Sequence, residues 1–139
     1  MPDPYDLNRF LSAQASVTEK VRSELRAGEK RGHWMWFVFP QIAGLGHSDM
    51  TRRYAIASLD EARAYGAHEI LGPRLIECVA LVVAVEGRSI GEIFGSPDDL
   101  KFHSSMTLFV RAALEEPVFR EALQKYFGGE EDAATVERI

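Results

Sequence analysis

The sequence predicts a single, mostly helical (all-α) domain. Its length of 139 residues is typical of one domain. Several serines stand three residues before a glutamate, the spacing of a helix-starting capping box. Apolar residues recur every three or four positions, as on the buried face of a helix. We therefore expect short and medium helices around a central apolar helix near residues 73–86.

Four helix starts are legible in the chain. In a capping box the serine side chain accepts from a backbone N–H, and the glutamate reaches back to the N–H of the serine. Ser96 would cap a fourth helix, with Pro97 in its first position and two carboxylates facing the positive end of the helix dipole. The three capping boxes are Ser16 with Glu19, Ser58 with Glu61, and Ser89 with Glu92.

The apolar pattern indicates where helices run. Val17, Val21 and Leu25 share one face, and Gly28 would end that helix. Broad apolar stripes also cover residues 106–113 and 118–127. Residues 75–85 are apolar nearly all round, which suits a helix covered on every side. Their many valines also allow a buried strand, but the length and the lack of neighbouring strand patterns favour a helix.

Two segments do not follow the helical pattern. Residues 34–39 are continuously apolar between Gly32 and Pro40, which predicts a short strand or an extended buried segment. Residues 130–139 are acidic at their start and are expected to form a loose tail, with a last short helix as the alternative. The whole chain, residues 1–139, is otherwise expected to be one helical domain.

Composition restricts the class of protein. The single cysteine, Cys78, excludes an intrachain disulfide and fits a reducing compartment. The acidic, proline-containing start lacks the basic and apolar parts of a signal peptide, and no apolar run approaches the roughly 20 residues that span a bilayer. A net charge of −5 disfavours nonspecific nucleic-acid binding. We expect a cytoplasmic protein with neither a membrane nor a nucleic acid as partner.

The first candidate binding segment covers residues 31–49. Two tryptophans close together could stack on a base and donate N–H groups, and the glycines allow tight turns. Ser48 or Asp49 would cap a following helix whose N–H groups could face an anion. The alternative, favoured for the tryptophans, is that the aromatic residues are core and the glycines shape a loop. The candidate ligand-binding residues here are Arg31, His33, Trp34, Trp36, Gln41, Gly44 and Gly46.

The second candidate segment covers residues 94–107. A helix from Pro97 would align Lys101 with Ser105, and Asp99 with His103, so that the carboxylate could orient the imidazole. The polar groups alternate with core aromatics, which favours a ligand site over the alternative of an exposed first turn with ion pairs. The candidate ligand-binding residues here are Asp99, Lys101, Ser104 and Ser105.

Several other kinds of site are not expected. The four histidines lack the spacing of a metal site, and no P-loop or nucleophile elbow is present. We therefore expect neither a metal nor a cofactor. Cys78 lies in the most apolar segment, where a thiol is normally inert. Its neighbour Glu77 would need a partner such as Arg74, or a ligand, if the helix is buried.

Five strings in the chain resemble a known family. The likeness spans about residues 5–128, and the family, found in bacteria and fungi, is known as domain of unknown function 1810. The resemblance implies a compact, mostly helical single domain and no particular reaction. Its members are often labelled calpastatins, a label that implies a disordered repeat chain, whereas this sequence is globular. The strings are LRAGEKRGHWMWFVFPQIAGLG (25–46), YAI (54–56), LGPRLIEC (71–78), IFGSPDDLK (93–101) and SSMTLF (104–109).

A weaker likeness extends to proteins that handle NAD or ADP-ribose derivatives, among them N-glycosidases. It rests on the aromatic segment, the Arg-Leu-x-Glu element of residues 74–77 and the glycine-acid turn. The resemblance implies that Glu77 and Lys101 contact the sugar or transfer protons, and that Trp34 or Trp36 stacks on a base. This is an analogy at the level of the fold.

Our leading hypothesis is a protein that binds a small anionic or nucleotide-like ligand between the two candidate segments. Whether it is also an enzyme is left open, with Glu77, Lys101 and His103 as candidates for catalysis. The alternative is a protein-interaction module, such as a homodimer, with Trp34, Trp36 or residues 126–127 at the interface. A structural domain without a site is the third interpretation.

Overall fold

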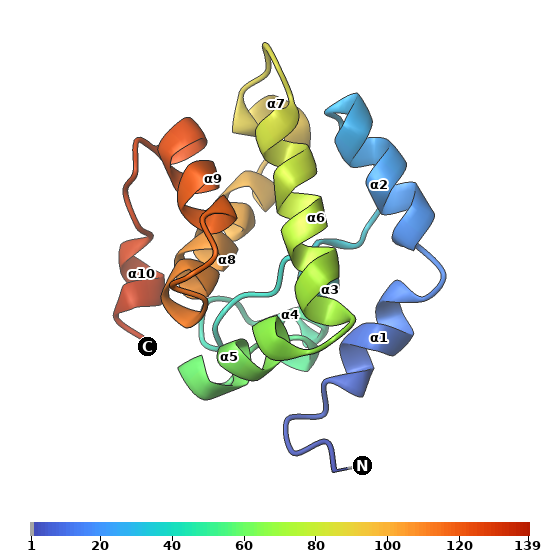
Figure 1. The fold of residues 1–139 in the computed structure, drawn as a ribbon, viewed down its shortest axis with the longest axis vertical. Helices are drawn as coiled ribbons and strands as arrows, with labels where there is room; N and C mark the ends of the chain where they lie inside the picture. Colours follow the sequence, from blue (N-terminus) through green and yellow to red (C-terminus); the bar gives the residue numbers. More distant parts are fainter. Residues whose placement is uncertain (1) are drawn as a thin grey trace.

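The computed structural model describes residues 2–139 and confirms the all-α prediction (Figure 1). Within these residues the regular elements are all helices, joined by short loops. The helices are α1 (Asn8–Gln14), α2 (Thr18–Ala27), α3 (Met35–Val38), α4 (Asp49–Arg53), α5 (Leu59–Ala67), α6 (Leu71–Ala84), α7 (Ile90–Phe94), α8 (Asp98–Ala112), α9 (Val118–Phe127) and α10 (Ala133–Val136).

The two longest helices, α6 and α8, organise the domain. The central apolar helix expected near residues 73–86 is α6, which lies between α2 and α9 and also contacts α5 (Figure 1). It is not covered on every side, because Glu77, Ala80 and Ala84 are exposed. The more enclosed helix is α8, in which every residue from Ser104 to Val110 is buried against its neighbours.

Side-chain caps form at only some of the predicted helix starts. Ser89 and Glu92 make the full capping box at α7, and Ser58 caps α5. Ser16 does not cap α2, because the turn from α1 closes on Val17, which takes the cap position. At α8 the cap position falls on Pro97 instead of Ser96, and the peptide bond between them is cis.

The prediction of a short strand or an extended segment at residues 34–39 is wrong. Residues Met35–Val38 form one helical turn, α3, with Trp34 and Phe39 buried beside it. A buried backbone must satisfy its hydrogen bonds, and residues 2–139 contain no strand that could supply partners. The N–H groups of Val38 and Phe39 bond to the carbonyls of Trp34 and Met35 instead, at 3.2 and 3.1 Å.

The loose tail expected at residues 130–139 is instead the short, packed helix α10. Asp132 caps it by accepting from the backbone N–H of Thr135, whose hydroxyl also donates to the same carboxylate oxygen at 2.6 Å. Thr135 is fully buried, and α10 contacts α8. Glu131 accepts two hydrogen bonds from Arg111, at 2.8 and 2.9 Å. These contacts hold the C-terminal residues on the domain.

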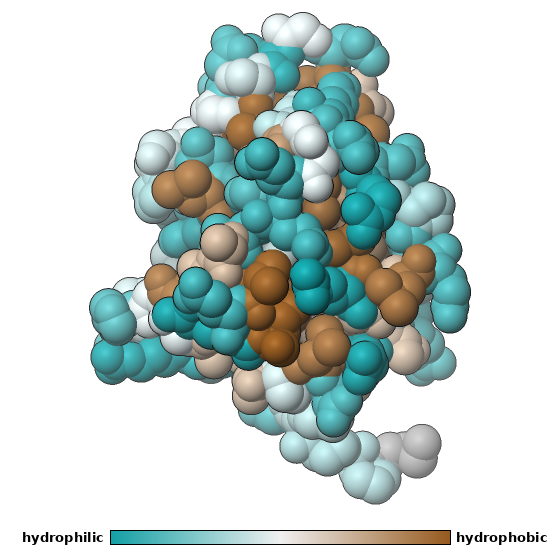
Figure 2. Space-filling view, turned by 90° about the vertical axis from the view of Figure 1, so that its left-hand side faces the viewer, coloured by the Kyte–Doolittle hydropathy of each residue, from teal (hydrophilic) through white to brown (hydrophobic). Residues whose placement is uncertain are grey.

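The surface is largely polar. Figure 2 shows the side of the molecule that carries α9 and α10, where hydrophilic residues predominate and the largest hydrophobic group lies near the middle of the face. The large hydrophobic side chains that are exposed, Ile70, Leu100 and Leu114, belong to three different segments. Among the described residues, no helix combines the length and apolar character needed to cross a bilayer.

Candidate ligand-binding cleft

The two candidate segments meet in a cleft of about 380 Å³. The loop after α3 forms one wall, anchored by a bridge in which Ile56 accepts from the N–H of Ala43 and donates to the carbonyl of Gln41, both at 2.8 Å. The first two turns of α8 form a second wall. Residues of α10 and its cap, together with Thr51 of α4, complete the cleft. The lining residues are Gln41, Leu45, Gly46, Thr51, Pro97, Leu100, Lys101, Ser104, Asp132 and Ala134.

Lys101 supplies positive charge to this cleft. Its Nζ lies 4.9 Å from the centre of a Trp36 ring and 3.6 Å from Oδ1 of Asp98. The other oxygen of Asp98 is 2.8 Å from Nζ of Lys30, whose side chain is only 8% exposed. Asp98 therefore lies between two cations, of which Lys101 lines the cleft. The longer contact to Lys101 leaves its ammonium with donors for a further acceptor.

Trp36 adds a hydrogen-bond donor next to the cleft. Its indole N–H is buried and has no partner among residues 2–139. The indole borders a small cavity that also contacts Gln41 and Thr51, and both of these residues line the cleft as well. A buried donor without an acceptor costs about 1–3 kcal/mol, so it marks a place where an acceptor would be stabilising.

The carboxylate in the cleft, Asp132, already accepts hydrogen bonds from neighbouring residues of the protein. Its Oδ2 accepts from the hydroxyl of Ser104 at 3.1 Å, in addition to the two bonds from Thr135. Ser104 is buried, and its single hydroxyl proton is shared between this oxygen and the carbonyl of Leu100, also at 3.1 Å. Sequence reasoning missed Asp132 because it treated residues 130–139 as a tail. The available signal was the Asp-x-x-Thr spacing of an N-cap.

Seven of the eleven candidate ligand-binding residues do not line the cleft, including Trp36 beside it and Asp99. Trp34 is 2% exposed and lies in the core, where Phe39 and Phe94 pack beside it. Ser105 is fully buried, and its hydroxyl has no partner within the described part of the chain. Arg31 and His33 are exposed on the loop before α3 and line none of the cavities described here. Gly44, in the loop after α3, has a φ of +98° and lies against Arg138 instead.

The predicted pairing of Asp99 with His103 is not formed. Asp99 accepts from the backbone N–H of Leu100 at 2.9 Å. His103 stacks flat on Phe127, with ring centres 3.9 Å apart, and its Nε2 lies 2.8 Å from the carbonyl oxygen of Glu130. The imidazole is therefore held by the end of α9, which supplies the aromatic face, and by the segment after it, which supplies the carbonyl.

Glu77 is also separate from the cleft. Its side chain is 45% exposed, and its carboxylate is 2.6 Å from Nε of Arg22. The partner of Glu77 is therefore Arg22 and not Arg74, which the sequence analysis named. It borders a different cavity, beside Cys78. Glu77 and Lys101 thus do not face one another across a common space. Among residues 2–139, no group of three or more histidine, cysteine or acidic side chains is arranged to hold a metal ion.

Trp34 has a structural partner in Glu24. Its indole N–H donates to Oε1 of Glu24 at 3.0 Å, and the same oxygen accepts from the backbone N–H groups of Arg31 and Gly32 at 2.7 and 2.9 Å. Burial raises the pKa of the Glu24 carboxyl, but these three donors and nearby Lys30 outweigh it and lower the pKa below its ordinary value of 4.5. The carboxylate thus fixes the loop that leads into the cleft.

Glu24→Gln is expected to remove a pH-dependent part of the stability. Because the pKa of Glu24 is lowered by folding, its charge stabilises the fold above about pH 4.5, and this contribution disappears as the pH falls through the folded-state pKa. Urea unfolding from pH 7 to pH 3 should therefore show a wild-type advantage that shrinks with acidification. Glu115→Gln, at an exposed residue, is the control. A difference constant over this range would contradict a role of the charge.

The fold and the cleft define a small, single-domain, all-α protein with one cation at the edge of a partly polar cleft. The chain belongs to the family described as protein of unknown function (DUF1810), whose sequence model matches residues 4–139. This confirms the resemblance drawn from the motifs. The comparison with curated proteins gives no match.

A solved structure shows the same single-domain fold. The chain is similar to the conserved hypothetical protein Rv1873 from Mycobacterium tuberculosis, known from its crystal structure. The two are 61% identical, the match covers 97% of this chain and 96% of that one, and the TM-score is 0.96. The likeness therefore extends over essentially the whole single domain.

Proposed function

We propose that the protein binds a small anionic or nucleotide-like ligand in the cleft between the loop after α3 and the start of α8. The observation that carries the proposal is the position of Lys101, which lines the cleft and shares its ion-pair partner, Asp98, with Lys30. An anionic group at Lys101 would give its ammonium an acceptor in addition to the carboxylate of Asp98, 3.6 Å away. Ligands with a phosphate or carboxylate satisfy that requirement.

The other walls favour a ligand with an apolar or flat part. Leu45, Pro97, Leu100 and Ala134 offer carbon surface, and polar groups from Gln41 and Thr51 stand among them. Binding sites for small molecules commonly combine apolar walls with a few convergent polar groups. A nucleotide meets both conditions, since its base would lie on the carbon surface and its phosphate near Lys101. Within this class, NAD and ADP-ribose derivatives are the ligands to test first, because the weaker resemblance found in the sequence analysis points to them.

Lys101→Met is expected to abolish binding without loss of the fold. The variant keeps the apolar stem beside Trp36 and removes only the charge. A thermal-shift screen against nucleotides, NAD, ADP-ribose and sugar phosphates would identify the ligand. At about 100 times its dissociation constant, a ligand adds about 2.7 kcal/mol, which raises the Tm by several degrees. That shift should be lost in Lys101→Met.

The matched control is Lys20→Met, which removes an exposed lysine from α2, outside the cleft. Its ligand-induced shift should equal that of the wild type. A full shift in Lys101→Met, or a Lys101→Met protein that is unfolded, would contradict the assignment of this residue. A flat screen would contradict the ligand class.

For the alternative, a protein-interaction module, most of the aromatic side chains expected at the interface already make contacts within the domain. Trp34 is buried, the hydroxyl of Tyr126 donates to the carbonyl of Val82 at 2.6 Å, and Phe127 is stacked on His103. These contacts occupy three of the four aromatic side chains that would form the interface. Sedimentation at increasing concentration separates the two functions, because a homodimer would show a rising mass without any ligand.

A further inference from the structure

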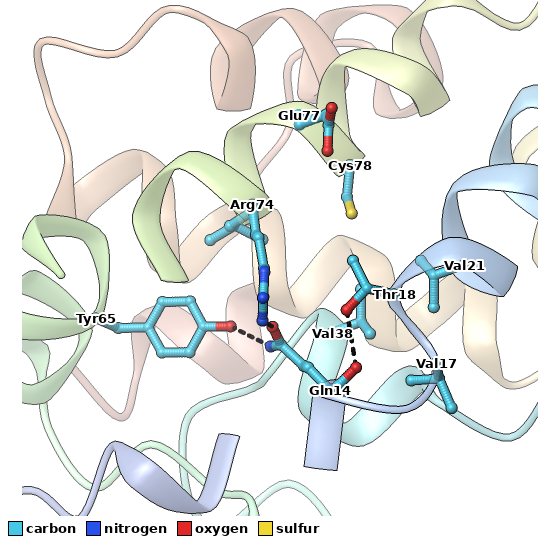
Figure 3. Close-up of a pocket in the computed structure, with 10 residues that line it drawn as sticks. Gln14, Val17, Thr18, Val21, Val38, Tyr65, Arg74, Glu77 and Cys78 are labelled. Atoms are coloured by element: carbon cyan, nitrogen blue, oxygen red, sulfur yellow. Dashed lines mark hydrogen bonds between the residues drawn. The ribbon is translucent and has the colours of Figure 1, made fainter. Parts of the chain in front are cut away.

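A wide groove lies apart from the cleft, where the ends of α6 and α8 meet the start of α9. Its volume is about 720 Å³, and it shares no lining residue with the cleft that contains Lys101. The cavity beside Cys78 (Figure 3) is far smaller, at about 20 Å³, where a single water needs about 10–15 Å³. That cavity has room for water only, whereas the groove has room for part of another molecule.

The deeper part of the groove is lined by carbon. Val110 of α8 is buried, Val83 of α6 is half-buried, and Pro117 stands at the start of α9. Leu114 lies at the edge and is 80% exposed, more than any other large hydrophobic residue among residues 2–139. A single exposed leucine is ordinary. Here it continues the apolar wall of a groove, which makes a surface that a partner can cover.

The rim of the groove carries more acid than base. Three glutamates line it, against one arginine and one lysine. Glu115 and Glu121 are exposed, and neither forms an ion pair within residues 2–139. Glu116 is half-buried and accepts from the backbone N–H of Val118 at 3.1 Å. The end of α8 at Ala112 adds the negative end of a helix dipole, because the last carbonyls of a helix have no partners within it.

One of the two cations is already engaged by the protein. The ammonium of Lys125 donates to the carbonyls of Val83 and Val85, each at 2.6 Å, and so offsets the negative end of α6. Arg120 is exposed and forms no ion pair in the described part of the chain. The rim therefore offers two free carboxylates against one free guanidinium, a balance that favours a positively charged partner.

The polar groups of the groove stand at its rim and not in its depth. A site for a small molecule usually holds a few buried polar groups that fix the ligand. The buried side-chain atoms without a hydrogen-bond partner among residues 2–139 belong to Trp36 and Ser105, and neither residue lines this groove. A carbon floor with charges around it is instead the anatomy of a protein interface.

We propose that this groove binds a basic amphipathic segment of a partner protein. Apolar side chains on one face of the segment would cover Val83, Val110 and Leu114, and lysines or arginines beside them would meet Glu115 and Glu121. An amphipathic helix laid in an apolar groove is a common mode of recognition. An acidic segment with the same apolar face would be repelled by the two carboxylates.

The test measures fluorescence anisotropy of two labelled peptides titrated with the whole protein. One is a synthetic peptide of about 14 residues, two heptads, with leucines and lysines in the helical period. The other has glutamate in place of each lysine. We expect saturable 1:1 binding of the lysine peptide and at least about 10-fold weaker binding of the glutamate peptide. Because the leucines are the same, the difference measures the charge of the groove.

The apolar edge is tested by Leu114→Ser, which should weaken binding of the lysine peptide about 10-fold. Ile70→Ser is the matched control, because it removes another exposed apolar side chain that does not line the groove. The control should bind the peptide as the wild type does. Both substituted residues are exposed, so the variants are expected to fold.

The charged rim is tested by the double variant Glu115→Gln with Glu121→Gln. It should weaken binding about 10-fold near 0.05 M sodium chloride and much less near 0.5 M, because salt screens exposed charges. The double variant Glu29→Gln with Glu69→Gln makes the same change in net charge at exposed residues outside the groove and should bind as the wild type does.

Three results would overturn the proposal. Equal losses in the two double variants would show nonspecific attraction to an acidic protein, and unchanged binding in Leu114→Ser would place the peptide elsewhere. A wild-type dimer in sedimentation that Leu114→Ser dissociates would show that a second copy occupies the groove. Lys101→Met should bind the lysine peptide normally, which separates this surface from the proposed nucleotide cleft.

Discussion

Arg9→Ala is expected to lower the free energy of unfolding by about 3–5 kcal/mol. The Arg9 guanidinium is 2.8 Å from a carboxylate oxygen of Glu61, and the Glu61 side chain is only 5% exposed. The other Glu61 oxygen accepts from the backbone N–H of Ala57 at 3.1 Å. Removal of Arg9 would leave this buried carboxylate without its cation, which costs far more than the pair contributes when intact.

Arg9 also joins parts of the chain that are distant in sequence. Its guanidinium donates to the carbonyls of Tyr5 and Asp6 before α1. It also donates to the carbonyls of Arg53, the last residue of α4, and of Ala55 in the loop that follows. These bonds hold the N-terminal segment against the loop that supplies Ile56 to the bridge below the cleft. The variant is therefore expected to loosen this side of the domain as well as to lower its stability.

Urea unfolding followed by circular dichroism measures the effect, with the change read from the midpoint at constant slope. The control is Arg63→Ala, which breaks an exposed ion pair with Asp60 and should change stability by no more than about 0.5 kcal/mol. The double variant Arg9→Leu with Glu61→Leu should recover much of the loss, because no buried charge remains. A loss below about 1 kcal/mol for Arg9→Ala would contradict the buried-charge argument.

Gly72→Ala is expected to destabilise the domain by about 1–3 kcal/mol, as overpacking does in a close-packed core. A Cβ at this position of α6 would lie 2.2 Å from the backbone carbonyl oxygen of Gly66 in α5. Because that neighbour is backbone, it cannot rotate away, and the two helices must separate. The measurement is the Tm by calorimetry, in which a loss of this size amounts to several degrees.

Gly66→Ala is the matched control for this prediction. It lies on the other side of the same contact, and a Cβ there meets nothing within 4 Å. The substitution reduces the freedom of the unfolded chain at a helical position, so it should stabilise by about 0.4–1 kcal/mol. Equal effects of the two substitutions would show that the close approach of α5 and α6 is not what requires glycine at position 72.

Local helix signals were predictive where the cap and the helix belong to one continuous stretch. Ser58 and Ser89 cap the helices that follow them because the required contact lies three residues away. The cap predicted at Ser16 does not form, because the preceding helix, α1, determines where the turn closes. The prediction for residues 34–39 was wrong for a related reason. An apolar run can satisfy its backbone hydrogen bonds as a strand or as a helical turn, and the neighbouring segments decide which of the two forms.

The candidate cleft was partly predictable. Gln41, Gly46, Lys101 and Ser104 were selected from two segments and lie around one space. Ser105 and Trp34 were selected on equal grounds, but they face the core. The helical period separates Ser104 from Ser105 by about 100°, so adjacent serines of α8 point to different surroundings. Sequence alone does not state which of those surroundings is the interior.

The amino-acid sequence was sufficient to predict the helical class, the apolar faces of α6, α8 and α9, and membership of the family. Each of these depends on residue type and on spacings of a few residues. Only the tertiary structure decided that Arg9 meets Glu61, that Gln14 meets Tyr65, and that Asp132 closes the cleft beside Ser104. These partners lie 52, 51 and 28 residues apart. They meet because packing of the apolar faces brings distant polar groups together, and those groups must then pair or face a cavity.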